Sequence, residues 1–106
     1  MKLRFVVAAG VLLAASFTAS AQSAEEKLAQ SKNCLACHQV DKKLVGPAYK
    51  DVAVKYAGDA GAADRLVKKV REGGTGVWGQ VPMPPNPQVS DAEAKTLVNW
   101  ILAMKK

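Results

Sequence analysis

The sequence predicts a small all-α domain of four to five short helices, preceded by an N-terminal segment that does not belong to it. Two segments match the Ser-x-x-Glu capping box that starts helices, and apolar residues recur at helical spacing in several places. No segment shows the alternation of apolar and polar residues expected of a half-buried strand. A chain of 106 residues is also short enough to form one domain.

The N-terminal segment has the three parts of a secretory signal peptide. Lys2 and Arg4 form a cationic start, residues 5–15 form an apolar run, and Ala19-Ser20-Ala21 matches a cleavage site. The alternative is an uncleaved membrane anchor, but a membrane-spanning helix needs about 20 apolar residues and this run is much shorter. We therefore expect residues 1–21 to be a cleaved signal peptide and residues 22–106 to form the exported domain, with no stable membrane insertion.

The mature domain is small and basic. Cleavage after Ala21 leaves 85 residues, and without Lys2 and Arg4 the formal charge is +4 rather than +6. A domain of this size has a marginal core that often needs a disulfide, a metal or a large cofactor. Nucleic acid is not expected as a partner, because the lysines are scattered rather than clustered: 32, 42, 43, 50, 55, 68 and 69. They form either an ordinary solvated surface or a positive face that steers an acidic protein partner.

The sequence Cys34-Leu35-Ala36-Cys37-His38 contains both cysteines and the only histidine of the chain. Cys-x-x-Cys-His is the attachment motif of c-type haem, in which two thiols bond the porphyrin and the imidazole binds its iron. A structural zinc site needs four ligands, and the chain offers three Cys and His residues in all. A thioredoxin-like dithiol needs a βαβ context, and a disulfide within so short a loop contributes little and leaves His38 unexplained. The motif therefore predicts one covalently bound haem c.

The first two helices are expected on either side of this motif. Ser23-Ala24-Glu25-Glu26 is a capping box, so a helix is expected to start there and run toward Asn33, delivering the haem-binding segment at its end. Pro47 suits the first turn of a second helix. The apolar residues of that helix, which Gly58 ends, are Tyr49, Val52, Ala53 and Tyr56.

Two further helices are expected in the second half of the chain. Leu66, Val67 and Val70 predict a third helix that ends at Gly73-Gly74. A second capping box, Ser90-Asp91-Ala92-Glu93, starts the last helix. Its apolar face comprises Ala94, Leu97, Val98, Ile101 and Met104.

The second axial ligand of the iron is expected between these two helices. Residues 73–89 are rich in Gly and Pro and therefore irregular. Met83 lies there in Val81-Pro82-Met83-Pro84-Pro85-Asn86-Pro87, where flanking prolines restrict the backbone and lower the entropy cost of holding a sulfur ligand. Met104, by contrast, completes the apolar face of a helix, so packing is its expected role.

Several motifs together carry a family resemblance: Cys-x-x-Cys-His, Val45-Gly46-Pro47-Ala48, Gly76-Val77-Trp78-Gly79, Pro82-Met83-Pro84-Pro85-Asn86 and the closing Ser90-to-Trp100 helix. With them, the whole mature chain resembles the small bacterial class I cytochromes c of the cytochrome c-551/c-552 group. The resemblance implies a cytochrome c fold with His38 and Met83 as axial ligands. One departure is visible, because Pro87-Gln88 makes the link from Asn86 to the last helix longer than expected.

The resemblance also implies roles for three supporting residues. The Pro47 carbonyl is expected to accept a hydrogen bond from the outer nitrogen of His38. Trp78 resembles the family tryptophan near a haem propionate, although packing is an equally good interpretation without that analogy. Asn86 resembles the asparagine that supports the methionine loop.

The function implied is a periplasmic electron carrier, not an enzyme. With both axial positions of the iron occupied, no site for substrate remains, and the neutral thioether favours the ferrous state. We expect a monomer that docks briefly on larger redox proteins of a respiratory chain, such as a nitrite reductase or a terminal oxidase. Val45 and Ala48 are expected around the exposed haem edge, with Lys32 and Lys43 outside them. The alternatives are a gas-binding or catalytic haem protein and a subunit bound permanently to a larger enzyme.

Overall fold

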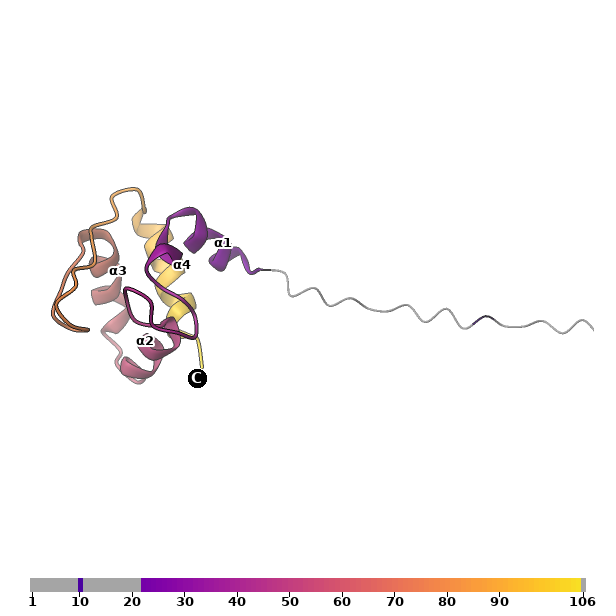
Figure 1. Cartoon of the computed structure of the whole chain (residues 1–106), viewed down its shortest axis with the longest axis horizontal. Helices are drawn as coiled ribbons and strands as arrows, with labels where there is room; N and C mark the ends of the chain where they lie inside the picture. The colour runs from indigo at the N-terminus through magenta and orange to yellow at the C-terminus, as the bar shows by residue number, and fades with distance from the viewer. Residues whose placement is uncertain (1–9, 11–21, 106) are drawn as a thin grey trace, which may run out of the picture.

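The computed structural model describes residues 22–105 and the separate residue Gly10. This part of the chain forms four α-helices and one 3₁₀ helix: α1 (Ala24–Ser31), η1 (Cys34–Ala36), α2 (Tyr49–Lys55), α3 (Ala62–Glu72) and α4 (Asp91–Leu102) (Figure 1). Its only strand-like pairings are two isolated bridges, His38 with Lys43 and Gly74 with Met83. The all-α prediction is therefore confirmed for these residues, whereas the predicted signal peptide 1–21 lies outside them.

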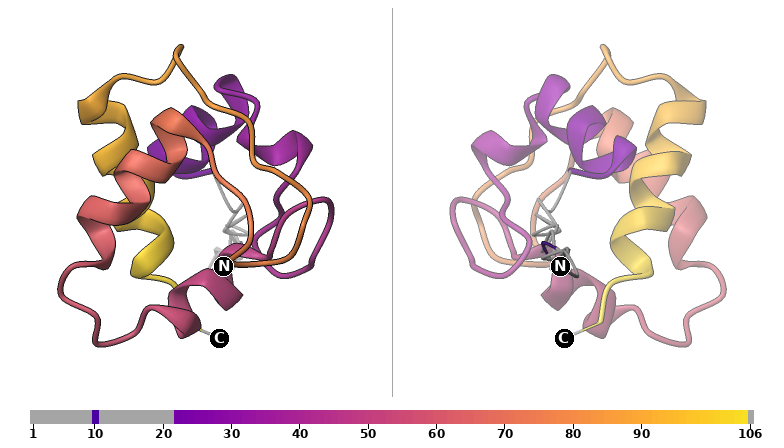
Figure 2. Two further views of the ribbon diagram at one scale, coloured as in Figure 1. Left: turned by 90° about the vertical axis from the view of Figure 1, so that its left-hand side faces the viewer. Right: turned by 90° about the vertical axis from the view of Figure 1, so that its right-hand side faces the viewer.

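Helix α4 organises the fold because it contacts α1, α2 and α3 (Figures 1 and 2). Its N-terminus has the predicted capping box: the Ser90 hydroxyl accepts from the Glu93 N–H at 3.1 Å, and the Ser90 N–H donates to Glu93 Oε1 at 3.0 Å. The buried core cluster draws on α1, α3, α4 and the residue before the α4 cap: Ala29, Val67, Val89, Ala94, Leu97 and Val98.

Two details of the predicted helices are wrong. Pro47 does not lie in the first helical turn, because α2 begins at Tyr49 with Ala48 as its N-cap. The Pro47 carbonyl accepts a hydrogen bond from His38, and Pro47 stays outside the helix. Helix α4 ends at Leu102, so Met104 follows the helix and does not complete its apolar face, although its half-buried side chain is consistent with packing.

The segment between α3 and α4 is irregular, as predicted. Helix α3 ends at Gly73, whose φ of 76° belongs to the left-handed region that glycine adopts without strain. A Cβ at Gly73 would lie 2.5 Å from the Met83 carbonyl oxygen, so the returning loop passes too close for any other residue. In the part of the chain described, no helix is long and apolar enough to cross a membrane.

The capping box makes the stability of α4 depend on pH. The Ser90 backbone N–H, and then the Ser90 hydroxyl and Lys32, hold the pKa of Glu93 below its ordinary value of 4.5. Because the folded pKa is lower than the unfolded one, the stabilisation is complete above pH 4.5 and is lost as the pH falls through the folded pKa.

We therefore predict that Glu93→Gln lowers the stability of the holoprotein at neutral pH. The difference from wild type should shrink progressively below pH 4.5. Thermal unfolding across this range measures it, with Glu25→Gln in the first turn of α1 as the control. A difference between wild type and Glu93→Gln that stays constant with pH would contradict the prediction.

Candidate functional site

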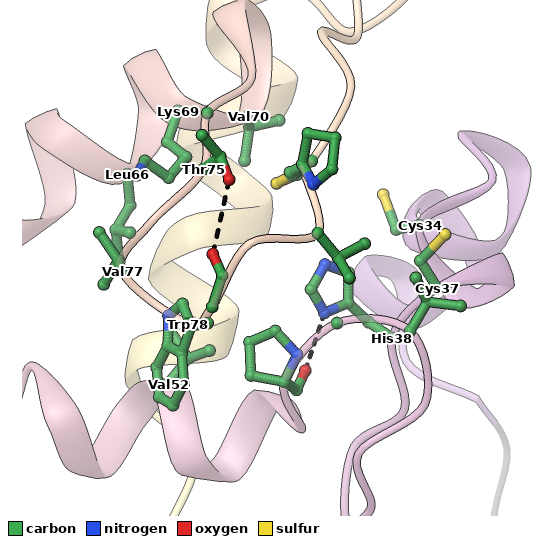
Figure 3. A pocket seen from close by; sticks show the side chains of 18 of the residues that line it. Cys34, Cys37, His38, Val52, Leu66, Lys69, Val70, Thr75, Val77 and Trp78 are labelled. Atoms are coloured by element: carbon green, nitrogen blue, oxygen red, sulfur yellow. Dashed lines mark hydrogen bonds between the residues drawn. The ribbon is translucent and has the colours of Figure 1, made fainter.

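A cavity of about 400 Å³ lies between the helices and the two long loops (Figure 3). Its wall is mainly apolar and includes Val52 of α2, Leu66 and Val70 of α3, and residues of α4. Six of the seven residues predicted for the site line it: Cys34, Cys37, His38, Pro47, Trp78 and Met83. Asn86 is not part of the wall. The fold thus brings together residues from distant parts of the chain around one space.

The imidazole of His38 has a fixed orientation. Its Nδ1 lies 2.8 Å from the Pro47 carbonyl oxygen, and because a carbonyl can only accept, Nδ1 donates the proton of this bond. The neutral ring then carries its lone pair on Nε2. The predicted role of the Pro47 carbonyl therefore has the required geometry, and Nε2 has the chemistry of an iron ligand.

Gly46 is required by the position of the same ring. A Cβ built on Gly46 would lie 2.5 Å from His38 Cε1 and 2.9 Å from Nδ1. Real side chains do not approach so closely, so only glycine lets the loop carry Pro47 past the imidazole. The sequence analysis included Gly46 in a motif but assigned it no role, because an isolated glycine does not reveal which side chain it faces.

The two cysteines are presented by a short turn. Asn33 adopts the left-handed conformation, with φ of 65°, and reverses the chain between α1 and η1. The His38 N–H then donates to the Cys34 carbonyl at 3.0 Å. Figure 3 shows both cysteine side chains on the same side of the cavity as His38, with Val77 and Trp78 across from them. Burial raises the pKa of the Cys34 thiol.

Met83 enters the cavity from the other loop, where its backbone is held on both sides. It exchanges two hydrogen bonds with Gly74: Met83 N–H to the Gly74 carbonyl at 2.8 Å and Gly74 N–H to the Met83 carbonyl at 3.0 Å. The Asn86 amide donates to the Pro84 carbonyl at 3.2 Å and to the Val70 carbonyl at 2.9 Å. Asn86 thus supports the loop from behind rather than from the cavity.

Tyr49 is a site residue that sequence reasoning treated only as part of an apolar helix face. Its ring stacks on His38, with centroids 5.0 Å apart, and meets Trp100 edge-on at 5.7 Å. Burial, reinforced by the neighbouring Cys34, raises the pKa of the Tyr49 phenol, so the group stays neutral beside the imidazole. The position of Tyr49 directly after Pro47-Ala48, which belongs to a motif of the family resemblance, was the sequence signal that could have pointed to this site residue.

Trp78 lies at the mouth of the cavity and is 42% exposed. The Lys55 ammonium lies 5.5 Å from the centroid of its ring, within the range of a cation–π contact. This exposure argues against a buried core aromatic and leaves the loop-packing interpretation of Trp78 open.

Two expectations about the residues around the mouth of the cavity need correction. Val45 is 52% exposed and lines the cavity, but Ala48 is 1% exposed and cannot contribute to an exposed rim. Lys32 is paired with Glu93 at 3.3 Å and also donates to the Gln88 carbonyl at 3.1 Å. Lys43 does line the cavity, as expected of a residue near its mouth.

The chemistry of this wall fits a haem. A cavity of this volume is within the range of cofactor sites, and its apolar lining suits a porphyrin. Two thiols three positions apart, an imidazole with a defined Nε2 lone pair and a thioether all border the same space. No group of three or more His, Cys, Asp and Glu residues in the described ranges could hold a separate metal ion.

Comparisons with known proteins agree with this chemistry. Residues 25–105 match the family model "Cytochrome c". The chain is 59% identical to cytochrome c-551 of Azotobacter vinelandii over 80 residues, which are 76% of this chain and 96% of the relative. It is 53% identical to cytochrome c-552 of Nitrosomonas europaea over 98 residues, 92% of this chain and 91% of the relative.

A solved structure is similar in both fold and sequence. The crystal structure of wild-type cytochrome c552 from Nitrosomonas europaea superposes with a TM-score of 0.73 at 58% identity. The alignment covers 74% of this chain and 98% of that chain.

We predict that Gly46→Ala displaces His38 and weakens its bond to Pro47. The new methyl group cannot fit 2.5 Å from the ring, so the holoprotein should lose about 1–3 kcal/mol of stability, measured by urea unfolding. Gly61→Ala is the control, because the one close contact of its new Cβ is with the flexible end of Arg65. Equal stability of Gly46→Ala and wild type would show that the loop can move away from the ring.

Proposed function

Because this chain belongs to the cytochrome c family, and is thus an electron-transfer protein with one covalently bound haem c, we propose that it carries single electrons between larger periplasmic redox proteins. Its donor and acceptor belong to a respiratory chain, with a nitrite reductase or a terminal oxidase as candidate acceptors. The observation that carries the proposal is the convergence of Cys34, Cys37, His38 and Met83 on one apolar cavity.

In this proposal each residue of the cavity has a defined task. Cys34 and Cys37 would hold the haem covalently, while His38 Nε2 and the Met83 sulfur would bind its iron. The haem supplies a one-electron change between ferric and ferrous iron. The Pro47 carbonyl keeps the His38 ring in one orientation, and Gly74 and Asn86 keep Met83 in place. Little of this framework needs to move when the charge changes.

The apolar wall favours electron transfer over binding or catalysis. It excludes water from the cofactor, and the thioether stabilises the ferrous state relative to a charged or nitrogen ligand. If His38 and Met83 both bind the iron, these two side chains would leave no position there for a gas or a substrate. A gas-binding or catalytic haem protein therefore requires that Met83 be absent from the iron, which can be measured directly.

Docking is proposed at the mouth of the cavity. Exposed apolar side chains border it, namely Val45 at 52%, Val77 at 46%, Trp78 at 42% and Val81 at 65%. Lys43 lies among them. A small apolar contact with positive charge around it suits a monomer that meets an acidic partner briefly and releases it.

The cellular location proposed is the periplasm, reached through a signal peptide of residues 1–21 that is removed. The first described helix supports this division, because its N-cap Ser23 follows closely after the expected cleavage site at Ala21. The domain then comprises residues 22–106.

The ligation is tested by Met83→Ala. We predict that the ferric protein loses the weak red charge-transfer band of iron–thioether bonding and that the reduction potential falls. Spectra and voltammetry of the purified holoprotein measure both. Met104→Leu is the control, since Met104 lies outside the cavity wall and should leave both properties unchanged. An unaltered spectrum of Met83→Ala would overturn the proposed function.

The docking surface is tested by reversing one charge. We predict that Lys43→Glu slows electron transfer with an acidic redox partner and weakens its dependence on ionic strength. The control is Lys68→Glu on α3, which pairs with Glu72 and does not line the cavity. Stopped-flow kinetics at several salt concentrations distinguish the two variants. Equal rates for both would place docking elsewhere.

A further inference from the structure

Gln88 connects the two segments that approach the cavity from opposite sides. Its side-chain Nε2 donates to the Lys32 carbonyl at 3.4 Å and to Asn86 Oδ1 at 3.1 Å. The Lys32 ammonium returns a bond to the Gln88 carbonyl at 3.1 Å, so Lys32 and Gln88 are joined in both directions. These two residues are separated by 56 positions in the sequence.

Each end of this connection is close to a residue that is proposed to hold the haem or its iron. Lys32 is the C-cap of α1 and lies two residues before Cys34, which opens the haem-attachment motif. Asn86 donates to the Pro84 carbonyl at 3.2 Å, directly after Met83. The hydrogen bonds therefore run from the attachment segment through Gln88 and Asn86 to the residue that follows Met83.

Gln88 also fixes which way Asn86 faces. Asn86 Nδ2 must donate to the Val70 and Pro84 carbonyls, which leaves Oδ1 in need of a donor. Gln88 Nε2 supplies it. Without Gln88, the Asn86 amide would lose its only side-chain donor in the described part of the chain and would be freer to rotate away from Pro84.

We propose, on the basis of the function proposed above, that Gln88 is a positioning residue for Met83. It acts through Asn86, and it ties the methionine loop to the segment that carries the two cysteines and His38. Glu93 reinforces the same junction, because its carboxylate binds Lys32 at 3.3 Å while also capping α4. The function of the junction is to hold the thioether against the iron, beyond any contribution to overall stability.

The test is the rate at which the Met83–iron bond opens. Gln88→Met has a side chain of similar length but no N–H, so it removes two hydrogen bonds and keeps the Lys32 bond to the backbone carbonyl. Saturating imidazole, added to the ferric holoprotein, binds only after Met83 has left the iron. We expect imidazole to bind Gln88→Met about three- to tenfold faster than wild type. This is the effect of about one net hydrogen bond, because both lost bonds are exposed and the one to Lys32 is long at 3.4 Å.

The matched control is Gln30→Met on α1, whose exposed side chain has no hydrogen-bond partner among residues 22–105. Its rate should stay within about twofold of wild type. The midpoint of urea unfolding, followed by circular dichroism, separates positioning from stability. Faster imidazole binding with an unchanged midpoint supports the proposal.

Two results would overturn it. The first is imidazole binding to Gln88→Met at the wild-type rate, and the second is faster binding accompanied by an equal loss of global stability. A wild-type ferric protein that lacks the thioether band is a different result, because it overturns the proposed function itself and this inference with it.

Discussion

The hydrogen bond from His38 Nδ1 to the Pro47 carbonyl is the contact on which the rest of the site depends. It determines which nitrogen faces the cavity, and it ties the loop after the attachment motif to the start of α2. Position 46 must be glycine, because any side chain there would clash with the His38 ring as the loop passes it. Tyr49 stacks on the same ring, with centroids 5.0 Å apart. Three residues of the 46–49 segment, Gly46, Pro47 and Tyr49, thus contact or accommodate the same imidazole.

The opposite side of the cavity is constrained differently, because a thioether cannot be oriented by a hydrogen bond as an imidazole can. The chain holds the backbone around Met83 instead, through the exchange of bonds with Gly74 and the support of Asn86 behind the loop. Restriction by Pro82 and Pro84 lowers the entropy of this segment before any ligand is bound. The proposed thioether ligand is therefore held through its backbone, and the proposed imidazole ligand through its ring.

The sequence predicted those features that depend on local chemistry. The attachment motif, the capping box at Ser90 and the stop at Gly73 each act over a few residues, so they could be recognised without the fold. The errors concern contacts between distant segments. Pro47 precedes α2 because its carbonyl binds His38, and Lys32 pairs with Glu93, 61 positions further along the chain. The family resemblance, not spacing, predicted the Pro47–His38 bond, and the sequence analysis did not predict the Lys32–Glu93 pair.

Contacts that the sequence alone does not reveal also change how the positive charge of the molecule is interpreted. Composition suggests a diffuse basic surface, but several lysines are locally neutralised by a carboxylate: Lys32, Lys50, Lys68 and Lys95. Lys43 and Lys55 form no ion pair within the described residues, and both lie beside the cavity, Lys43 on its wall and Lys55 over Trp78. Charge that is not neutralised close by is the part that steers an acidic partner, because salt screens exposed charges beyond about 10 Å. Lys43 and Lys55 therefore leave positive charge beside the mouth of the cavity, where docking is proposed.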